Sequence, residues 1–168
     1  ADSGVIEVGG QVCPIHGPED ALAAGIGVVH QHFMLVDIFT VLENILLGAE
    51  GGALLGPGMA AARAEIARLE ADYGLEVDPD ALVGDLAVGL RQRVELLKAL
   101  YRGANILILD EPTGVLTPQE AERLFEILTA MRDRGVTIIL ITHKLQEIMA
   151  ITDNVSVMRA GQMVAHRE

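Results

Sequence analysis

The chain has 168 residues, of which 51% are hydrophobic and only 3% aromatic, and its formal net charge is −12. This length suits one domain that buries a sizeable core, and the aliphatic composition is typical of an α/β interior. The acidic balance argues against a nucleic-acid surface, which needs clustered lysine and arginine, and no apolar run approaches the ~20 residues that span a bilayer.

The amino-terminal part predicts short strands. Residues 5–8 and 11–14, which flank a Gly-Gly pair, are typical of a β-hairpin. Residues 25–29 are a further strand candidate.

The middle of the chain predicts three helices and one loop. Thr40 and Glu43 have the spacing of a capping box, which indicates that a short helix begins there. Residues 48–58 contain five glycines and one proline and indicate a flexible loop or hinge. Apolar residues recur at helical spacing over 59–73 and again over 90–101, and both segments are followed closely by glycine.

A run of four aliphatic residues, 106–109, is followed directly by Asp110 and Glu111. An apolar run of this length predicts a strand that is buried on both faces. Such a strand would deliver the two carboxylates to one edge of a sheet.

The next segment predicts a helical crossover. Thr117 and Glu120 form a second capping-box pattern, and residues 118–134 predict a helix of roughly 25 Å. Residues 136–142 predict a strand of roughly 23 Å that ends just before His143. The helix is long enough to return the chain across the sheet, so the two strands can run parallel.

Asp110, Glu111 and His143 are therefore predicted to converge at the edge where open α/β sheets place their ligands. Each residue alone would fit an ordinary role in capping or polarising a helix. Two acids with an imidazole at the matching end of the next strand favour a functional site.

Four blocks of sequence, in the same order, resemble the nucleotide-binding ATPase subunits of ABC transporters. The resemblance covers nearly the whole chain and is strongest to importers of simple sugars and nucleosides. The blocks are the Q-loop at 30–33, the signature motif and the start of its helix at 86–93, Walker B with its catalytic glutamate at 106–112, and the switch histidine at 142–143.

The resemblance implies a P-loop NTPase-like α/β core with a mostly parallel sheet and an α-helical signature subdomain, with the amino-terminal part of that fold missing. Residues 1–30 would be the remnant of a β-subdomain, residues 31–103 the Q-loop and helical subdomain, and residues 104–168 the core from Walker B onward. In the family the phosphate-loop strand lies within the core sheet, so we expect an unpaired sheet edge and exposed apolar surface.

ATP and Mg²⁺ are the ligands that the resemblance implies. Asp110 would hold Mg²⁺ through its water shell, and Gln31 would touch the metal or the attacking water. Glu111 would orient and polarise that water, and His143 would sense or stabilise the γ-phosphate.

The signature block is expected to bind the γ-phosphate of an opposite subunit. Ala87, Val88 and Gly89 stand at a helix start, and Gly89 allows the backbone to approach closely. Ala87 replaces the serine of the family and Leu90 replaces its glutamine or a similar polar residue. Losing one such donor typically costs ~1–3 kcal/mol.

His30 and His32 flank Gln31, and an isolated His-x-His pair would suit either a polar loop or a metal site. With the other three blocks present, the Q-loop interpretation is favoured over a metal. Cys13 is the only cysteine, so no disulfide can form within the chain and a reducing compartment is the natural reading.

The 168 residues contain no Gly-x-x-x-x-Gly-Lys-[Ser/Thr] phosphate loop, and neither Lys98 nor Lys144 stands in such a context. Three accounts are open: a fragment of a larger ATPase, an inactive homologue that regulates or scaffolds a transporter, or a chain whose missing half another chain supplies. The presence of Asp110, Glu111, Gln31 and His143 favours the fragment account, because a protein that kept only a structural role would have no physical need for these residues.

The leading hypothesis is the motor domain of an ABC importer, in the cytoplasm and peripheral on the inner face of the cell membrane. Its partners would be transmembrane permease subunits, a second ABC ATPase domain and, indirectly, a substrate-binding protein, with no nucleic acid. Residues 33–44 are expected to contact the membrane subunit. The rival hypothesis is a nucleotide-incompetent interaction module.

Overall fold

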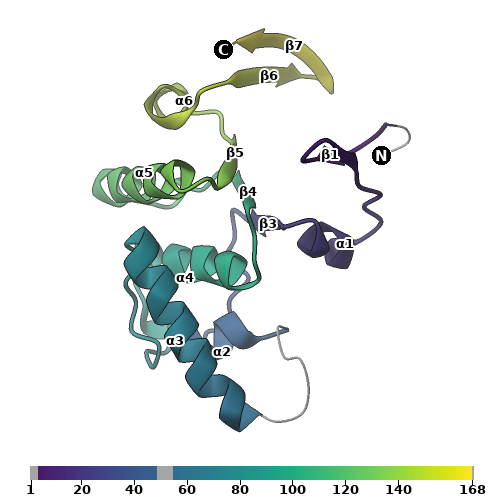
Figure 1. Cartoon of the computed structure of the whole chain (residues 1–168). Helices are drawn as coiled ribbons and strands as arrows, with labels where there is room; N and C mark the ends of the chain where they lie inside the picture. Colours follow the sequence, from purple (N-terminus) through teal and green to yellow (C-terminus); the bar gives the residue numbers. More distant parts are fainter. Residues whose placement is uncertain (1–3, 49–54, 168) are drawn as a thin grey trace.

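The computed structural model describes residues 4–48 and 55–167. Figure 1 shows a small central sheet with the longer helices on one side, short α1 on the other, and a hairpin at each end of the chain. The elements in chain order are β1 (Glu7–Val8), β2 (Gln11–Val12), α1 (Pro18–Ala23), β3 (Ile26–Val29), α2 (Val41–Leu46), α3 (Leu55–Tyr73), the 3-10 turn η1 (Val83–Asp85), α4 (Val88–Tyr101), β4 (Ile106–Asp110), α5 (Pro118–Asp133), β5 (Thr137–Ile141), α6 (Leu145–Ile151), β6 (Val155–Arg159) and β7 (Gln162–Arg167).

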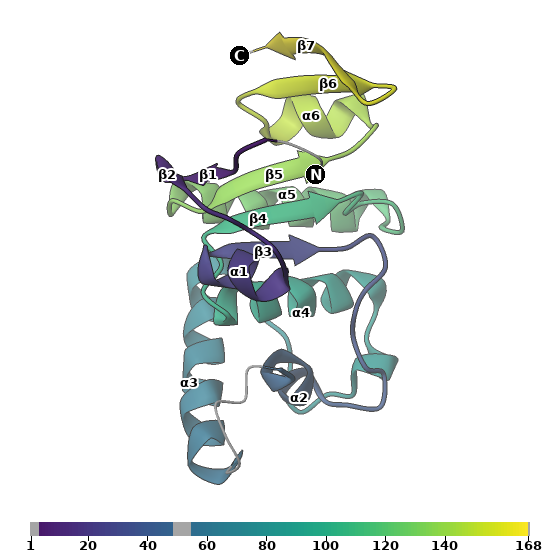
Figure 2. The same cartoon turned by 90° about the vertical axis from the view of Figure 1, so that its right-hand side faces the viewer.

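The central sheet has three parallel strands in the order β3-β4-β5. Val28 pairs with Ile108, and Ile108 pairs with Ile139, so the carboxyl ends of the three strands lie at one edge. Figure 2 shows the strands pointing the same way. Helix α5 makes the crossover from β4 to β5, as the sequence predicts, and Thr117 closes its capping box with Glu120.

Helices α4 and α5 lie on the same side of the sheet (Figure 1). Leu107 and Leu109 point into this layer and are fully buried. On the opposite face, Ile139 is 47% exposed and Ile141 50% exposed. Ile106 and Ile108 of β4 are only half-buried on this face. The expectation that residues 106–109 are buried on both faces is therefore wrong for one face, because α4 and α5 pack against the other and only short α1 lies beside β3 here.

Strand β5 pairs only with β4 within the described residues, so its outer backbone edge is free. The expected unpaired edge and exposed apolar surface are therefore confirmed. Helix α6 and the β6-β7 hairpin lie beyond this edge (Figure 2).

Helices α2, α3 and α4 form a helical layer below the sheet (Figures 1 and 2). The predicted stripe of α3 packs into the core, where Ala62, Ile66 and Leu69 are buried. The helix begins at Leu55, so the predicted loop 48–58 is wrong in its last residues, and residues 49–54 lie outside the described part. Glycine and proline do not stop the helix here because backbone N–H groups in a first turn need no intrahelical partner.

The β6-β7 hairpin was not predicted from sequence. Its two-residue turn consists of Ala160 and Gly161, with φ values of 48° and 76°. Two positive φ values suit the right-handed twist of the flanking strands. The usual asparagine or aspartate signal for such a turn is absent, and alanine rarely adopts this conformation.

The one-sided burial of the sheet predicts unequal costs of truncation. Leu107→Ala should lower the free energy of unfolding by about 2–5 kcal/mol, because it opens a cavity in the covered face. Ile139→Ala should lower the free energy of unfolding by less than about half as much, because Ile139 is already 47% exposed. Urea denaturation of the two variants tests this, and equal costs would show that the exposed face is packed in solution.

Candidate functional site

Glu111 and His143 meet at the carboxyl edge of the sheet. Nδ1 of His143 lies 2.6 Å from Oε1 of Glu111. The side chain of His143 is 77% exposed and that of Glu111 23% exposed, so the pair faces outward from the edge. Asp110 is the last residue of β4 and pairs with Ile141, the last of β5, which places it at the same edge.

The backbone around Glu111 holds its side chain in an unusual direction. Glu111 has a φ of 47°, in the left-handed region that residues with a side chain rarely adopt. Its N–H donates to the carbonyl of Ile141 at 2.9 Å, and its carbonyl accepts from the N–H of Gly114 at 3.0 Å. Backbone strain of this kind is concentrated at functional sites, where the surrounding contacts fix it in place.

Buried Gln92 on α4 also supports this segment. Its side-chain amide donates to the carbonyl of Pro112 at 2.8 Å. The loop after β4 is thus held from the helical layer and from β5 together.

Gln31 approaches the same edge from the third strand. It follows β3, its side chain is exposed, and its Nε2 lies 3.9 Å from the position that a methyl group on Gly114 would take. The structure therefore brings Gln31 close to the loop after β4, as expected for residues that follow neighbouring parallel strands.

The segment that follows Gln31 is fastened to α4 at Met34. Buried Glu95 accepts from the N–H of Met34 at 2.5 Å, and Lys98 donates from Nζ to the carbonyl of Met34 at 3.0 Å. Burial lowers the pKa of Lys98 from its ordinary value. This lysine therefore stabilises a loop and does not project from the edge.

Asn44 fixes the other end of this segment. It is fully buried on α2, its Oδ1 accepts from the N–H of Val36 at 2.7 Å, and its Nδ2 donates to the carbonyls of Val36 and Thr40, each at 3.0 Å. Residues 34–44 thus have a defined backbone although Met34 is 65% and Ile38 79% exposed.

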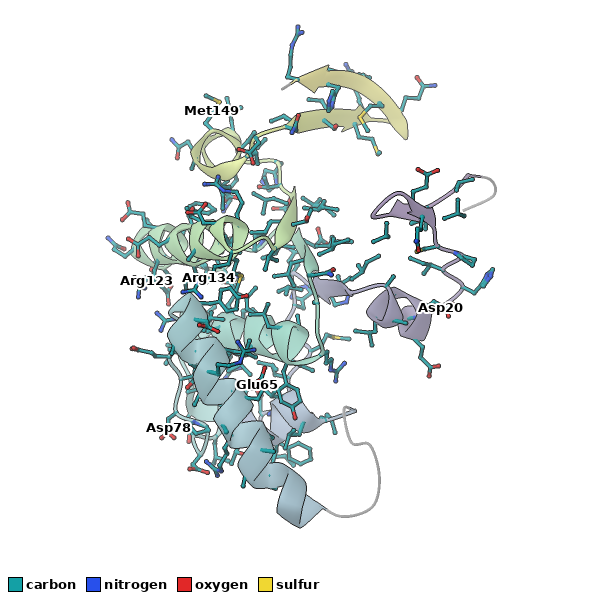
Figure 3. The ribbon with its side chains drawn as sticks, viewed as in Figure 1. Asp20, Glu65, Asp78, Arg123, Arg134 and Met149 are labelled. Carbon is teal, nitrogen blue, oxygen red and sulfur yellow. The ribbon has the colours of Figure 1, made fainter. Side chains whose placement is uncertain are left out.

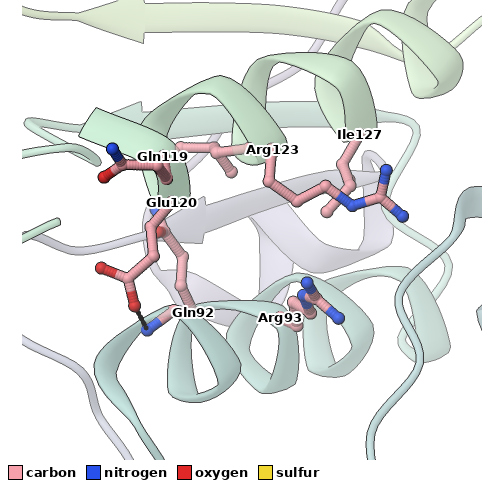
Figure 4. Close-up of a pocket in the computed structure, with 8 residues that line it drawn as sticks. Gln92, Arg93, Gln119, Glu120, Arg123 and Ile127 are labelled. Carbon is pink, nitrogen blue, oxygen red and sulfur yellow. Dashed lines mark hydrogen bonds between the residues drawn. The ribbon is translucent and has the colours of Figure 1, made fainter. Parts of the chain in front are cut away.

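The signature block lies at the start of α4, which begins near the carboxyl edge of the sheet and runs back beneath it (Figure 2). Ala87 caps the helix without a side-chain hydrogen bond. The N–H of Gly89 donates to Oε1 of Glu120 on α5 at 3.3 Å, the bond drawn in Figure 4. A Cβ at this position would lie 2.9 Å from the same oxygen, so any larger residue here would displace the carboxylate of Glu120.

A cavity of about 180 Å³ lies between α4 and α5 beside this contact (Figure 4). Glu120 lines it and also closes the capping box of α5, so its carboxylate joins the first turns of two helices. The backbone N–H and hydroxyl of Thr117, together with the N–H of Gly89, hold the pKa of Glu120 below its ordinary value.

Five buried polar side chains were not found by the sequence reasoning, although several of them organise the loops of the site. Asn44 and Glu95 stand among apolar residues, and that local context is a signal that could have found them, whereas Gln92, Thr113 and Glu147 have polar neighbours in the sequence and give no such signal. They are Asn44, Gln92, Glu95, Thr113 and Glu147.

The carboxyl edge of the sheet offers few side chains that could serve as metal ligands. Within residues 4–48 and 55–167, no group of three or more histidine, cysteine, aspartate or glutamate residues is arranged to hold a metal. Asp110 supplies a carboxylate and Gln31 an amide oxygen at this edge. Mg²⁺ keeps several waters and usually takes one or two protein carboxylates beside phosphate oxygens, so this sparse set fits magnesium that arrives with a nucleotide.

A sequence model of the family described as ABC transporter matches residues 1–114. The chain belongs to this family. It is similar to the nucleoside import ATP-binding protein NupA of Lactococcus lactis (51% identity; 96% of this chain and 32% of the relative) and to the guanosine import ATP-binding protein NupO of Bacillus subtilis (50%; 96% and 32%). It is also similar to the ribose import ATP-binding protein RbsA of Chromobacterium violaceum (41%; 100% and 34%). The chain thus spans about a third of the length of the relatives that it matches.

Solved structures confirm the ABC ATPase fold that the sequence predicts. A nucleotide-free ATP-binding cassette from an ABC transporter superposes with a TM-score of 0.82 over 99% of this chain and 70% of its own length, at 22% identity. The cbiO1 protein of Clostridium perfringens gives a TM-score of 0.80 over 98% of this chain and 65% of its own length, at 25% identity.

The lowered pKa of Glu120 predicts a pH-dependent contribution to stability. A carboxylate whose folded-state pKa lies below its unfolded value stabilises the fold above the unfolded pKa, and this contribution is lost as pH falls through the folded pKa. The free energy of unfolding of the Glu120→Gln variant should therefore fall below that of the unmodified chain at neutral pH, and the difference should shrink in acid. Urea denaturation over this pH range measures it.

Glu43→Gln is the matched control, because Glu43 closes the other capping box and its pKa is lowered by Thr40 alone. Both variants should show the same pH trend in stability. Only Glu120→Gln should shift the backbone amide resonance of Gly89. A difference that is constant with pH, or an unmoved Gly89 resonance, would contradict the assigned contacts.

Proposed function

We propose that this chain is the ATP-binding and ATP-hydrolysing motor part of an ABC importer for a simple sugar or a nucleoside. The observation that carries the proposal is the 2.6 Å contact between Glu111 and His143 at the edge where Asp110 also ends its strand. The names of the similar proteins, which import nucleosides, guanosine and ribose, support the solute class.

The residues at the edge suit phosphoryl transfer to water. Magnesium ATP, when bound, would supply the transferable phosphoryl group and neutralise its developing charge. Asp110 and Gln31 would hold the water shell of the metal, and Glu111 would accept a hydrogen bond from the attacking water and orient it. Because Nδ1 of His143 faces Glu111, its Nε2 remains free to contact the γ-phosphate.

A second ATPase domain, in the same chain or another, would complete the site. The backbone of residues 87–89 would face the γ-phosphate held by that domain, since N–H groups at the start of a long helix bind anions. The N–H of Gly89, which donates to Glu120 in this structure, would exchange that carboxylate for a phosphate oxygen. The extra hydroxyl that a serine would offer is missing at Ala87.

The surface of residues 33–44 would contact a transmembrane permease subunit. Met34 and Ile38 present exposed apolar side chains from a backbone that Asn44 and Glu95 hold in place. A rigid apolar surface next to Gln31 would transmit nucleotide occupancy to a membrane partner. A substrate-binding protein would act only indirectly, through the permease.

The proposed place is the cytoplasmic face of the cell membrane, where the chain would be peripheral. None of the helices in the described residues has the length and apolarity required to cross a bilayer. The proposed division into a β-subdomain remnant (1–30), a Q-loop and helical subdomain (31–103) and a Walker B core (104–168) follows from the same family.

The chain spans 32% of the length of the first two relatives, and its 168 residues hold no phosphate loop, so we infer that it works as one piece of a larger ATPase. The alternative is a nucleotide-incompetent regulatory or scaffold module. It is supported by the altered signature residues Ala87 and Leu90. The two functions differ in whether the acids at the edge act on a nucleotide.

The motor function predicts hydrolysis when a phosphate loop is supplied. A chain extended at its amino terminus by a phosphate-loop segment should hydrolyse MgATP, and Glu111→Gln in that chain should retain ATP while losing turnover by about 10²-fold or more. Single-turnover assays with a nucleotide-retention measurement test both effects. Unchanged hydrolysis in Glu111→Gln would refute the role of Glu111, and an extended chain that neither binds nor hydrolyses ATP would favour the scaffold alternative.

For the 168-residue chain itself, we expect no stabilisation by MgATP in a thermal melting assay. Binding at a hundredfold excess over Kd would add about 2.7 kcal/mol to the free energy of unfolding, which such an assay resolves easily. A clear upward shift in Tm would show that this chain binds nucleotide without a phosphate loop.

A further inference from the structure

Glu147 on α6 is a buried carboxylate for which the proposed reaction has no use. Only 5% of the residue is exposed. Figure 3 shows Met149, two residues later and 79% exposed, on the outer side of the same helix. Glu147 therefore lies on the inner side of α6, toward the ends of β4 and β5.

The contacts of Glu147 join two loops. One carboxylate oxygen accepts from the hydroxyl of Thr113, and the other accepts from the hydroxyl of Thr142 at 2.8 Å. Thr113 lies two residues after Glu111, and Thr142 directly precedes His143. The partners of Glu147 thus stand beside the two residues that form the contact at the edge.

Lys144 completes this network from the other side of His143. Its Nζ donates to the carbonyl of Thr113 at 3.1 Å and to the hydroxyl of Thr113 at 2.8 Å, and it lies 3.3 Å from Glu147. Its backbone N–H donates to the hydroxyl of Thr142 at 3.1 Å. Each threonine hydroxyl therefore accepts from Lys144 and donates to Glu147, and all of these groups are satisfied together.

Removal of a carboxylate from water is unfavourable, and an apolar side chain of similar size often gives equal or greater stability. Stability alone therefore does not account for a buried Glu147. A fully satisfied buried polar network does fix one geometry, because any other arrangement leaves a donor or acceptor without a partner. The geometry that this network fixes is the spacing between the loop after β4 and the loop after β5.

We propose that Glu147 is a positioning residue that clamps these two loops and thereby holds the imidazole of His143 against the carboxylate of Glu111. What the Glu111–His143 pair does rests on the proposed function. The clamp itself is a geometric property of the chain and is measured without nucleotide.

The test uses the 168-residue chain labelled with ¹⁵N in its histidine rings. The measurement is made in alkaline solution and compares the ¹⁵N shifts of the two ring nitrogens. In the unmodified chain the carboxylate of Glu111 faces Nδ1, so His143 should carry its proton on Nδ1. The signals of His143 are assigned by their loss in His143→Asn.

Glu147→Leu should shift His143 from the Nδ1-protonated form to a mixture of the two tautomers, because the loops lose their common acceptor. Glu147→Gln keeps one acceptor oxygen and therefore one of the two threonine contacts, so it should retain more of the Nδ1-protonated form than Glu147→Leu does. Glu126→Leu, which removes an exposed carboxylate on α5, is the control and should change nothing. Thr142→Val removes only the hydroxyl beside His143 and should also give a mixture of tautomers. It serves as the test if Glu147→Leu does not fold.

An unchanged tautomer in Thr142→Val, or in a folded Glu147→Leu, overturns the clamp, and so does a mixture of tautomers in the unmodified chain. In an extended chain that hydrolyses MgATP, Glu147→Leu should lower kcat by about 10²-fold with a smaller change in KM, because misplacement of catalytic groups acts mainly on the reaction step. If Glu147→Leu changes the tautomer of His143 as expected but the extended chain hydrolyses no MgATP, the clamp is supported and the proposed function is refuted.

Discussion

The register between β4 and β5 is the constraint on which the candidate site depends. Five residue pairs, from Ile106 opposite Thr137 to Asp110 opposite Ile141, bring the two strands to their ends side by side. A slip by one residue would move an end by about 3.3 Å and turn its side chains to the other face. Glu111 and His143 directly follow these paired strand ends, by one and two residues respectively, and their side chains meet at 2.6 Å.

Helix α4 makes this edge and the segment after β3 part of one rigid unit. Gln92 holds the carbonyl of Pro112, and Glu95 holds the N–H of Met34 one turn later on the same helix. Any displacement of α4 is therefore shared by the loop that carries Glu111 and by the loop that follows Gln31. The contact of Gly89 with Glu120 adds the first turn of α5 to the same unit.

Local and long-range information explain what the sequence could and could not predict. Both capping boxes, the crossover helix and the ends of the parallel strands follow from residues close together in the chain. Exposed apolar surface was expected only from the family resemblance, and the local pattern could not assign it to Ile139 and Ile141, because apolar residues do not show which side of the sheet the helices take. Gln92 bonds to a residue 20 positions away, and Glu147 bonds to Thr113, 34 positions away, so patterns of short spacing do not show these two contacts.

Neither of the chain's two lysines is available at the edge to bind a triphosphate. Lys98 donates to the carbonyl of Met34 and Lys144 to Thr113, so both ammonium groups serve the loops. The residues that the edge presents are instead two carboxylates, an amide and an imidazole, and a net charge of −12 adds repulsion toward a polyanion. Acids so placed become useful only when a metal ion and a cationic phosphate loop neutralise the nucleotide, since they orient water and metal but do not attract phosphate. In the proposed function, the acidity of the edge thus suits the hydrolytic half of a site whose phosphate-binding half lies elsewhere.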